Sequence, residues 1–143
     1  MTVVYVDTSV LVALVVPEHH SPAVTRWYGR SRAELVSAVW CVTEFASALG
    51  IKQRTGQLDA LQAQAAWQRF LRLATNDLVL LPVAAQGCHR AAELSLDAAS
   101  GLRAGDALHL GSAELAGART MATLDAVLAR GARRLKMKLV AFP

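Results

Sequence analysis

The sequence is short of acids, cysteines and aromatic residues. Of its 143 residues, 11 are Asp or Glu, 2 are Cys and 6% are aromatic. The two cysteines, Cys41 and Cys88, stand apart, with no CxxC motif and no cysteine–histidine cluster. A zinc site or a disulfide framework is therefore excluded, and we expect two reduced thiols in the core of a cytoplasmic protein.

A long hydrophobic run is also missing. The uninterrupted apolar stretch near the N-terminus covers only residues 8–16, whereas a membrane span needs about 20 residues. The stretch is preceded by Asp7 and lacks the basic segment of a signal peptide. We therefore expect neither a membrane segment nor a targeting peptide.

Apolar residues, in contrast, are plentiful. They make up 54% of the chain, which excludes disorder and gives a chain of this length enough core for a single domain over residues 1–143. The formal net charge is +4, and arginine supplies most of the cations. This charge is compatible with a nucleic-acid partner but does not identify one.

Short apolar runs alternate with longer amphipathic segments. Continuously apolar runs are typical of strands that are buried on both faces, and strands that alternate with helices indicate a parallel sheet. The predicted class is α/β, with a small parallel sheet of four to five strands and helices on both faces. The predicted strands cover 3–6, 34–38, 78–83, 120–124 and 138–142, and the predicted helices cover 8–16 (capped by Thr8 or Ser9), 21–32, 39–54, 58–75, 84–99, 102–118 and 126–135.

Four of the eleven acids lie in apolar surroundings. Asp7, Glu44 and Asp125 are each the only charge in a local apolar stretch, and Asp106 opens the segment DALHLGSA. Asp7 and Asp125 directly follow predicted strands, where open parallel sheets carry their sites. If the four carboxylates converge, they repel one another, and a divalent cation with a preference for oxygen ligands, Mg²⁺ or Mn²⁺, resolves that repulsion.

Each acid also has a plainer interpretation. Asp7 and Asp125 could be helix caps or turn formers, and Asp106 could favour a helix N-terminus through the macrodipole. Glu44 could lie on the exposed side of its helix. The combination of four such acids at separate element ends favours a site.

Four motifs around these acids resemble the PIN-domain family, and within it the VapC-type toxin ribonucleases of type II toxin–antitoxin systems. They are VYVDTSVLVALV with Asp7, VTEFASAL with Glu44, GDALHLGSAELAGA with Asp106, and TLDAVLARGARRL with Asp125. The resemblance spans nearly the whole chain. One departure is the stretch Lys136-Met137-Lys138, where many relatives carry a glycine that closes the last helix.

This resemblance implies a PIN-like fold and an endoribonuclease that uses Mg²⁺ or Mn²⁺ and acts on RNA. It also implies a VapB-type antitoxin as partner and a homodimer. By the family pattern, the acidic quartet is Asp7, Glu44, Asp106 and Asp125, and Ser9 and Thr123 occupy the supporting hydroxyl positions.

We expect Asp7 and Asp106 to bind the metal directly and Asp125 to bind it directly or through water, with Glu44 as a ligand or as the residue that orients the attacking water. Thr8, Ser9 and Thr123 would hold the carboxylates in place. Arg103 could contact a phosphate or could simply be a solvated residue at a helix start.

Three other features of the sequence are predicted to have structural roles and not to belong to the site. His109 is predicted to be a packed helix residue rather than a ligand. The segment Glu18-His19-His20 is predicted to be loop. Trp27, Trp40 and Trp67 are predicted to be anchors in the core or at a partner surface, rather than platforms on which bases stack.

Two rival functions remain at this stage. A non-cleaving RNA- or protein-binding PIN-like module would usually have lost one or more of the four acids, which this chain keeps. A phosphoacceptor enzyme of the haloacid-dehalogenase type would need an Asp where Ser9 stands, and no glycine-rich nucleotide-phosphate motif is present.

Overall fold

The computed structural model describes residues 2–143 and contains five strands, seven α-helices and one 3₁₀ turn. In chain order they are β1 (Val3–Val6), α1 (Thr8–Val15), α2 (Ser21–Arg30), β2 (Glu34–Ala38), α3 (Trp40–Arg54), α4 (Ala60–Asp77), β3 (Leu78–Leu81), α5 (Ala85–Leu96), the 3₁₀ turn (Ala98–Ser100), α6 (Ala104–Leu115), β4 (Thr120–Ala122), α7 (Ala126–Arg134) and β5 (Lys138–Leu139).

The strands form one sheet in the order β3-β2-β1-β4-β5, and every pairing is parallel. The chain leaves β1 toward β2 and β3, and later crosses back to place β4 and β5 on the other side. The sheet order therefore reverses at β1, and the loops after β1 and β4 diverge there. In open α/β sheets this reversal point, at the carboxyl ends of the strands, is where ligands bind.

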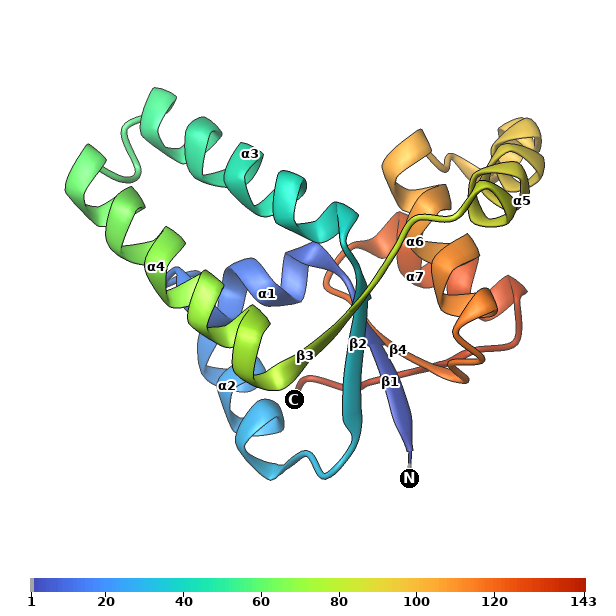
Figure 1. Cartoon of the computed structure of the whole chain (residues 1–143), viewed down its shortest axis with the longest axis horizontal. Helices are drawn as coiled ribbons and strands as arrows, with labels where there is room; N and C mark the ends of the chain where they lie inside the picture. Colours follow the sequence, from blue (N-terminus) through green and yellow to red (C-terminus); the bar gives the residue numbers. More distant parts are fainter. Residues whose placement is uncertain (1) are drawn as a thin grey trace.

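Helices cover both faces of the sheet, as predicted. In Figure 1, α1 to α4 lie on one side and α5 to α7 on the other. Within β1, Val4 and Val6 face the first group of helices and Tyr5 faces the second. Because successive side chains of a strand point to opposite faces, a strand covered on both sides must be apolar throughout, which explains the continuous run VVYV.

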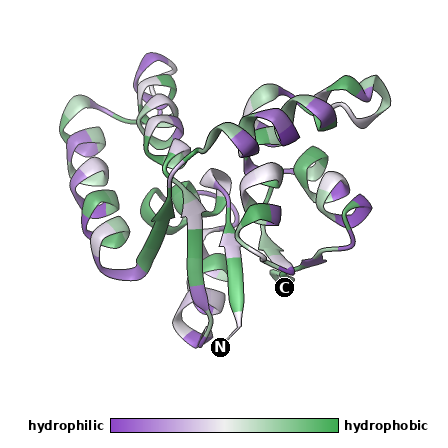
Figure 2. Cartoon of the chain, turned by 45° about the vertical axis from the view of Figure 1, so that its right-hand side comes forward, coloured by the Kyte–Doolittle hydropathy of each residue, from purple (hydrophilic) through white to green (hydrophobic). Residues whose placement is uncertain are grey.

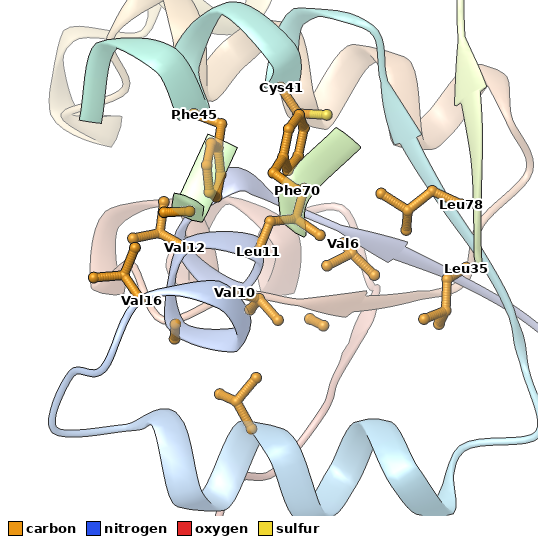
Figure 3. Packing of buried hydrophobic residues seen from close by; sticks show 14 of the residues in the cluster. Val6, Val10, Leu11, Val12, Val16, Leu35, Cys41, Phe45, Phe70 and Leu78 are labelled. Carbon is orange, nitrogen blue, oxygen red and sulfur yellow. The ribbon is translucent and has the colours of Figure 1, made fainter. Parts of the chain in front are cut away.

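The larger core cluster packs α1 to α4 against the sheet. Figure 3 shows Phe45 of α3 and Phe70 of α4 at its centre. Their ring centroids lie 4.1 Å apart at an interplanar angle of 13°, and the Trp67 ring stacks on Phe70 at 5.6 Å. Aromatic pairs of this kind contribute about 0.5–1.5 kcal/mol beyond the burial of their area. The stack joins α3, which carries Glu44, firmly to α4.

Most helices are amphipathic. Figure 2 shows green strands in the middle of the molecule and alternating purple and green along the surrounding helices. In α4 the buried side chains are Ala63, Ala66 and Phe70, at the three- and four-residue spacing of one helix face. Within residues 2–143, none of the helices combines the length and the apolar character that crossing a bilayer would require.

Element boundaries and caps differ from the sequence predictions in several places. The strands predicted over 78–83, 120–124 and 138–142 are two or three residues shorter, because their ends turn into the loops at the sheet edge. The helix predicted over 84–99 ends at Leu96 and is followed by the 3₁₀ turn. The predicted cap at Thr8 or Ser9 was wrong: Asp7 caps α1, because its carboxylate accepts from the Val10 N–H.

The prediction of two core thiols was half right. Cys41 is buried in α3, whereas Cys88 is exposed on α5. The buried face of α5 carries the small residues Gly87 and Ala91, and Cys88 follows Gly87 directly and so points away from that face.

The turn after α7 forms without a glycine. Lys136 takes a φ of 62°, a left-handed conformation that costs a residue with a side chain about 1–2 kcal/mol. The helix end is closed by the Lys136 N–H, which donates to the Arg133 carbonyl, and by the Met137 N–H, which donates to the Ala132 carbonyl. The departure from the family pattern therefore leaves the turn itself in place.

Candidate active site

The four acids come from four different elements around the carboxyl edge of the sheet. Asp7 directly follows β1, and Asp125 follows β4 and precedes α7. Glu44 lies on the second turn of α3, on one side of the sheet, and Asp106 on the first turn of α6, on the other. Asp7 and Asp125 each cap a helix, as the plainer interpretation predicted, and each also lies at the sheet edge.

Asp7 is the most deeply placed of these acids. Its side chain is 4% exposed, and both carboxylate oxygens accept hydrogen bonds. Oδ1 accepts from the Ser9 hydroxyl at 2.6 Å and from the Val10 N–H at 3.4 Å, and Oδ2 accepts from the Thr123 hydroxyl at 2.9 Å. Burial raises the pKa of Asp7 to about 6, against the effect of the Ser9 and Thr123 hydrogen bonds.

The two hydroxyls that hold Asp7 also bind the loop after β4. Ser9 Oγ accepts from the Leu124 N–H at 2.9 Å, and Thr123 Oγ1 accepts from the Asp125 N–H at 3.0 Å. Each hydroxyl therefore donates to Asp7 and accepts from the loop. Because the same pair of bonds joins the start of α1 to the start of α7, the position of Asp125 is coupled to that of Asp7.

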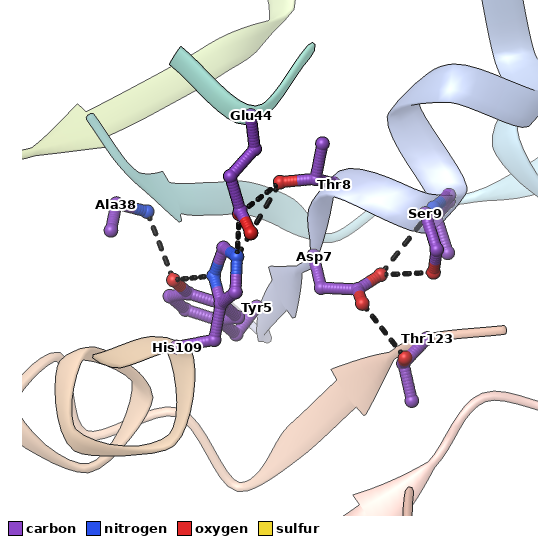
Figure 4. Close-up of polar contacts among 9 residues, drawn as sticks. Tyr5, Asp7, Thr8, Ser9, Ala38, Glu44, His109 and Thr123 are labelled. Atoms are coloured by element: carbon purple, nitrogen blue, oxygen red, sulfur yellow. Dashed lines mark hydrogen bonds and ion pairs between the residues drawn. The ribbon is translucent and has the colours of Figure 1, made fainter. Parts of the chain in front are cut away.

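Glu44 is held by a different set of donors. Its side chain is 30% exposed, and Oε1 accepts from the Thr8 hydroxyl at 2.6 Å and pairs with His109 Nε2 (Figure 4). Burial by itself would raise the pKa of Glu44, but the hydrogen bonds from His109 and Thr8 outweigh it and lower the pKa below its usual value. Glu44 is therefore ionised near neutral pH.

Asp106 and Asp125 are both partly buried. Asp106 accepts only the Arg103 N–H, at 3.3 Å on Oδ2. Burial raises the pKa of Asp106, and the charges of Asp125 and Glu44 raise it further, so both lie within electrostatic reach of Asp106. Asp125 Oδ1 accepts from the Val127 and Leu128 N–H groups of α7, and Oδ2 takes part in no hydrogen bond within residues 2–143.

The donor set suits a hard divalent cation, although the carboxylates are not drawn together. The acidic side chains at this edge all offer carboxylate oxygens, the donor atoms that Mg²⁺ and Mn²⁺ prefer. In the described part of the chain, no three Asp, Glu, His or Cys side chains lie close enough to hold a metal ion. The reason is their orientation: Glu44 turns toward His109 and Thr8, and Asp125 toward the first N–H groups of α7.

A sequence model of the PIN domain matches residues 4–134, which is nearly the whole chain. The chain belongs to the PIN domain family. The match covers all four acids and the three hydroxyl residues around them.

Solved structures with the same fold include several toxin–antitoxin proteins. VapC20 of Mycobacterium tuberculosis, described as a toxin that cleaves the sarcin–ricin loop, is 14% identical, with a TM-score of 0.73 over 90% of this chain and 94% of its own. FitAcB of Neisseria gonorrhoeae is 16% identical, with a TM-score of 0.71 over 96% of each chain. VapBC2 of Rickettsia felis, solved with a DNA fragment from its promoter, is 14% identical, with a TM-score of 0.66 over 99% of this chain and 100% of its own.

The TM-scores show that these proteins share the fold, and at identities this low the likeness shows the fold alone. A search among curated proteins found no match to the sequence.

An open cleft of about 500 Å³ adjoins the acidic edge of this PIN domain. Its lining includes Thr8, Ser9 and Leu124 beside the start of α1, and Glu44 and Ile51 of α3. The cleft therefore exposes two of the hydroxyls and one of the four carboxylates to a ligand.

The remaining predicted residues take different positions. Arg103 is exposed just before α6, and its guanidinium makes no hydrogen bond or ion pair within residues 2–143. Glu18, His19 and His20 lie between α1 and α2, as predicted for a loop, and Glu18 pairs with Lys52 instead of with the histidines.

His109 is the site neighbour that the sequence prediction undervalued. It is buried in α6, as predicted, but both ring nitrogens have polar partners and one of them is Glu44. Its position three residues after Asp106 was the available signal, because residues three apart share a helix face.

Trp40 also lies beside the site. Its Nε1 is buried and has no hydrogen-bond partner among the described residues. Trp67 belongs to the core stack, and the ring of Trp27 packs edge-on against Phe142, so both are core residues, as the anchor interpretation allowed.

Proposed function

We propose that this PIN domain is a metal-dependent endoribonuclease and the toxin of a VapBC-type toxin–antitoxin system. The observation that carries the proposal is that Asp7, Glu44, Asp106 and Asp125 all lie around the same carboxyl edge of the sheet, near its reversal point, although each comes from a different segment of the chain. Membership of the PIN domain family and the fold shared with VapC20 support it.

In this proposal Asp7, Asp106 and Asp125 hold Mg²⁺ or Mn²⁺. When bound, such a cation lowers the pKa of a water molecule and neutralises charge that grows on the scissile phosphate. Asp7 would be the fixed ligand, because three donors already orient its carboxylate. Asp125 would use Oδ2, since Oδ1 is engaged by the N-terminus of α7.

The remaining residues of the proposed site orient the carboxylates, the attacking water or the RNA. Glu44 is ionised and is one of the residues that line the cleft, so it orients the attacking water or contributes as a further ligand. Thr8 holds Glu44, and Ser9 and Thr123 hold Asp7. The unengaged guanidinium of Arg103, one helical turn from Asp106, contacts an RNA phosphate.

The proposal includes two protein partners. The structures of VapBC2 and of the VapBC complex of Salmonella typhimurium share this fold, and both contain a VapB–VapC pair by their description. We propose a VapB-type antitoxin as partner, a homodimer as the assembled toxin, and the cytoplasm as the location. A small reading frame next to the gene, whose product co-purifies with this chain and blocks its cleavage of RNA, would support the partner; an isolated gene would argue against it.

RNA cleavage tests the reaction directly. Purified protein is incubated with a pool of structured and single-stranded RNAs in Mg²⁺, in Mn²⁺ and in EDTA. We expect cleavage with either metal and none in EDTA. Asp7→Asn and Asp106→Asn should each abolish it, while Glu93→Gln, which removes an exposed acid on α5 far from the site, should leave it unchanged.

Two results would contradict the proposal. Metal-dependent cleavage that survives both Asp7→Asn and Asp106→Asn would show that the acids do not carry the reaction. RNA binding without cleavage in any metal would favour the non-cleaving PIN-like module.

A further inference from the structure

His109 is a buried polar side chain whose hydrogen bonds are all made to other buried or site residues. It is 2% exposed on α6. The Tyr5 hydroxyl lies 2.7 Å from Nδ1, and Nε2 pairs with Glu44 Oε1 (Figure 4). The chain of contacts therefore runs from the central strand of the sheet, through the ring, to one of the four acids.

The direction of these bonds follows from counting protons. The Tyr5 hydroxyl accepts from the Ala38 N–H at 3.1 Å, and burial raises its pKa far above the usual value, so it keeps its own proton. Its hydrogen-bond partners within residues 2–143 are the Ala38 N–H and His109 Nδ1, and the Ser37 hydroxyl is a further polar neighbour. With Tyr5 as the donor, Nδ1 accepts and the ring proton lies on Nε2, facing Glu44.

The consequence for Glu44 is a difference between its two oxygens. Oε1 receives the Nε2–H of His109 and the Thr8 hydroxyl. Oε2 lies near the bare Cα of Gly105 and the indole of Trp40, because a Cβ at Gly105 would come within 3.2 Å of Oε2 and 3.4 Å of Trp40 Nε1. Gly105 directly precedes Asp106, so the side of Glu44 without these two donors faces the turn that carries the next acid.

We propose that Tyr5 and His109 are a positioning pair, which holds the Glu44 carboxylate by Oε1 and leaves Oε2 on the side of Gly105, next to the turn that carries Asp106. The inference rests on the proposed nuclease function, because it assigns Glu44 a part in that site. Neither Tyr5 nor His109 contacts RNA or metal in this assignment. They act only through the tautomer of the ring and the orientation of one carboxylate.

The tautomer can be measured without metal or substrate. In the EDTA-treated protein, ¹⁵N-detected imidazole correlations should show His109 as a neutral ring with its proton on Nε2. Tyr5→Phe removes the proton donor to Nδ1, so the signal should move toward a mixture of tautomers. A wild-type ring with its proton on Nδ1, or a tautomer that Tyr5→Phe leaves unchanged, would overturn the assignment.

Two substitutions of His109 separate positioning from packing. Gln places an amide N–H near the position of Nε2 and keeps the donor to Glu44, whereas Asn places its amide near Nδ1 and keeps only the Tyr5 contact. We expect His109→Gln to retain cleavage and Mn²⁺ affinity to within about threefold. His109→Asn should lose about 10–100-fold in both, the range seen when partners of metal ligands are removed.

Mn²⁺ affinity is measured by calorimetry, and thermal unfolding shows whether each variant folds. If the role of His109 were packing alone, both variants would lose stability and Mn²⁺ affinity together, and Gln would not rescue. Equal Mn²⁺ affinity in folded His109→Gln and His109→Asn would overturn the positioning pair.

Failure of the proposed function gives a different pattern. It would appear as wild-type protein that neither binds Mn²⁺ nor cleaves RNA, and it would remove the site to which Glu44 is assigned. The tautomer experiment still decides whether the Tyr5–His109 bond has the stated direction. If the wild-type protein cleaves RNA and His109→Asn cleaves it equally well, the positioning pair is rejected and the proposed nuclease function stands.

Discussion

Asp7 and Asp106 lie at the same edge of the sheet but in opposite kinds of surroundings. Asp7 is 4% exposed, follows the central strand and accepts three hydrogen bonds. Asp106 is partly exposed, lies on the first turn of a helix and accepts one backbone N–H at 3.3 Å. One carboxylate is held by the fold, and the other is held weakly and faces further carboxylates.

The difference indicates how the two would serve a metal. Asp7 is oriented before any ligand arrives, and burial is the main reason that its pKa rises to about 6. The pKa of Asp106 is raised first by burial and then by Asp125 and Glu44, and a cation would relieve that repulsion. With a metal bound as proposed, Asp7 would be the rigid reference point, and Asp106 a ligand that can adjust.

The largest expected effect is on catalysis, where the two acids should behave alike. Asp7→Asn and Asp106→Asn should each lower the cleavage rate by at least about 100-fold, the usual order when a group that stabilises transition-state charge is removed. Single-turnover cleavage at saturating Mg²⁺ measures it. A much smaller loss in Asp106→Asn would mean that the weakly held acid is dispensable.

Asp7 and Asp106 should differ in how their ionisation affects the stability of the folded protein. The pKa of Asp7 is about 6 in the folded protein against an ordinary 3.8, so the folded state binds a proton more tightly than the unfolded chain. The stability that Asp7 contributes to the metal-free protein is therefore fully present below pH 4 and is lost as pH rises from about 4 to about 6. The loss attributable to Asp7 is about 3 kcal/mol.

Asp7→Asn removes this dependence. Urea unfolding in EDTA at pH 4 and pH 8 should show Asp7→Asn gaining on the wild-type protein by about 3 kcal/mol between the two values. Asp106→Asn should gain less, because its carboxyl is partly exposed. An equal gain in both variants would remove the distinction drawn between the two acids.

The hydroxyls around Asp7 give a smaller effect. Thr123→Val deletes the donor to Asp7 Oδ2 and the acceptor of the Asp125 N–H, and should destabilise the protein by about 1–3 kcal/mol. The loss should be greater at pH 8, where Asp7 is ionised, than at pH 4. Thr8→Val is the matched control, because Thr8 bonds Glu44 instead, and its loss should not follow the ionisation of Asp7.

Arg103 gives the smallest effect. Its guanidinium is exposed and bears on the substrate only, so Arg103→Gln should raise the KM for RNA by up to about fivefold, the range of an exposed charge contact, and leave kcat unchanged. Arg72→Gln, an exposed cation on α4, is the control. A fall in kcat for Arg103→Gln would place Arg103 closer to the reacting phosphate than we propose.

Sequence patterns predicted the architecture well because the physics behind them is local. The run VVYV is typical of a strand covered on both faces, and the isolated charge of Asp7 marked the end of that strand. Strand lengths were less predictable: the run from 78 to 83 ends as a strand at Leu81, since pairing partners and not composition decide where a ladder stops.

The site was predictable in its residue types and less so in its contacts. Four acids in apolar stretches marked the edge of the sheet, and Ser9 and Thr123 lie against Asp7 as the family pattern implied. The part of His109 was not visible, because its partners Tyr5 and Glu44 are 104 and 65 positions away in the chain. Likewise the exposure of Cys88 depends on which face of α5 meets α6, and no local pattern gives that rotation.

The bond between Thr123 and Asp7 joins residues 116 positions apart in a chain of 143. Ribosomes add about 5–20 residues each second and domains fold as their segments emerge. A growing chain therefore carries Asp7 and Glu44 long before the residues that complete their surroundings exist. An enzyme that degrades RNA would, on this account, stay harmless to the ribosome that makes it until almost its whole length has left the exit tunnel.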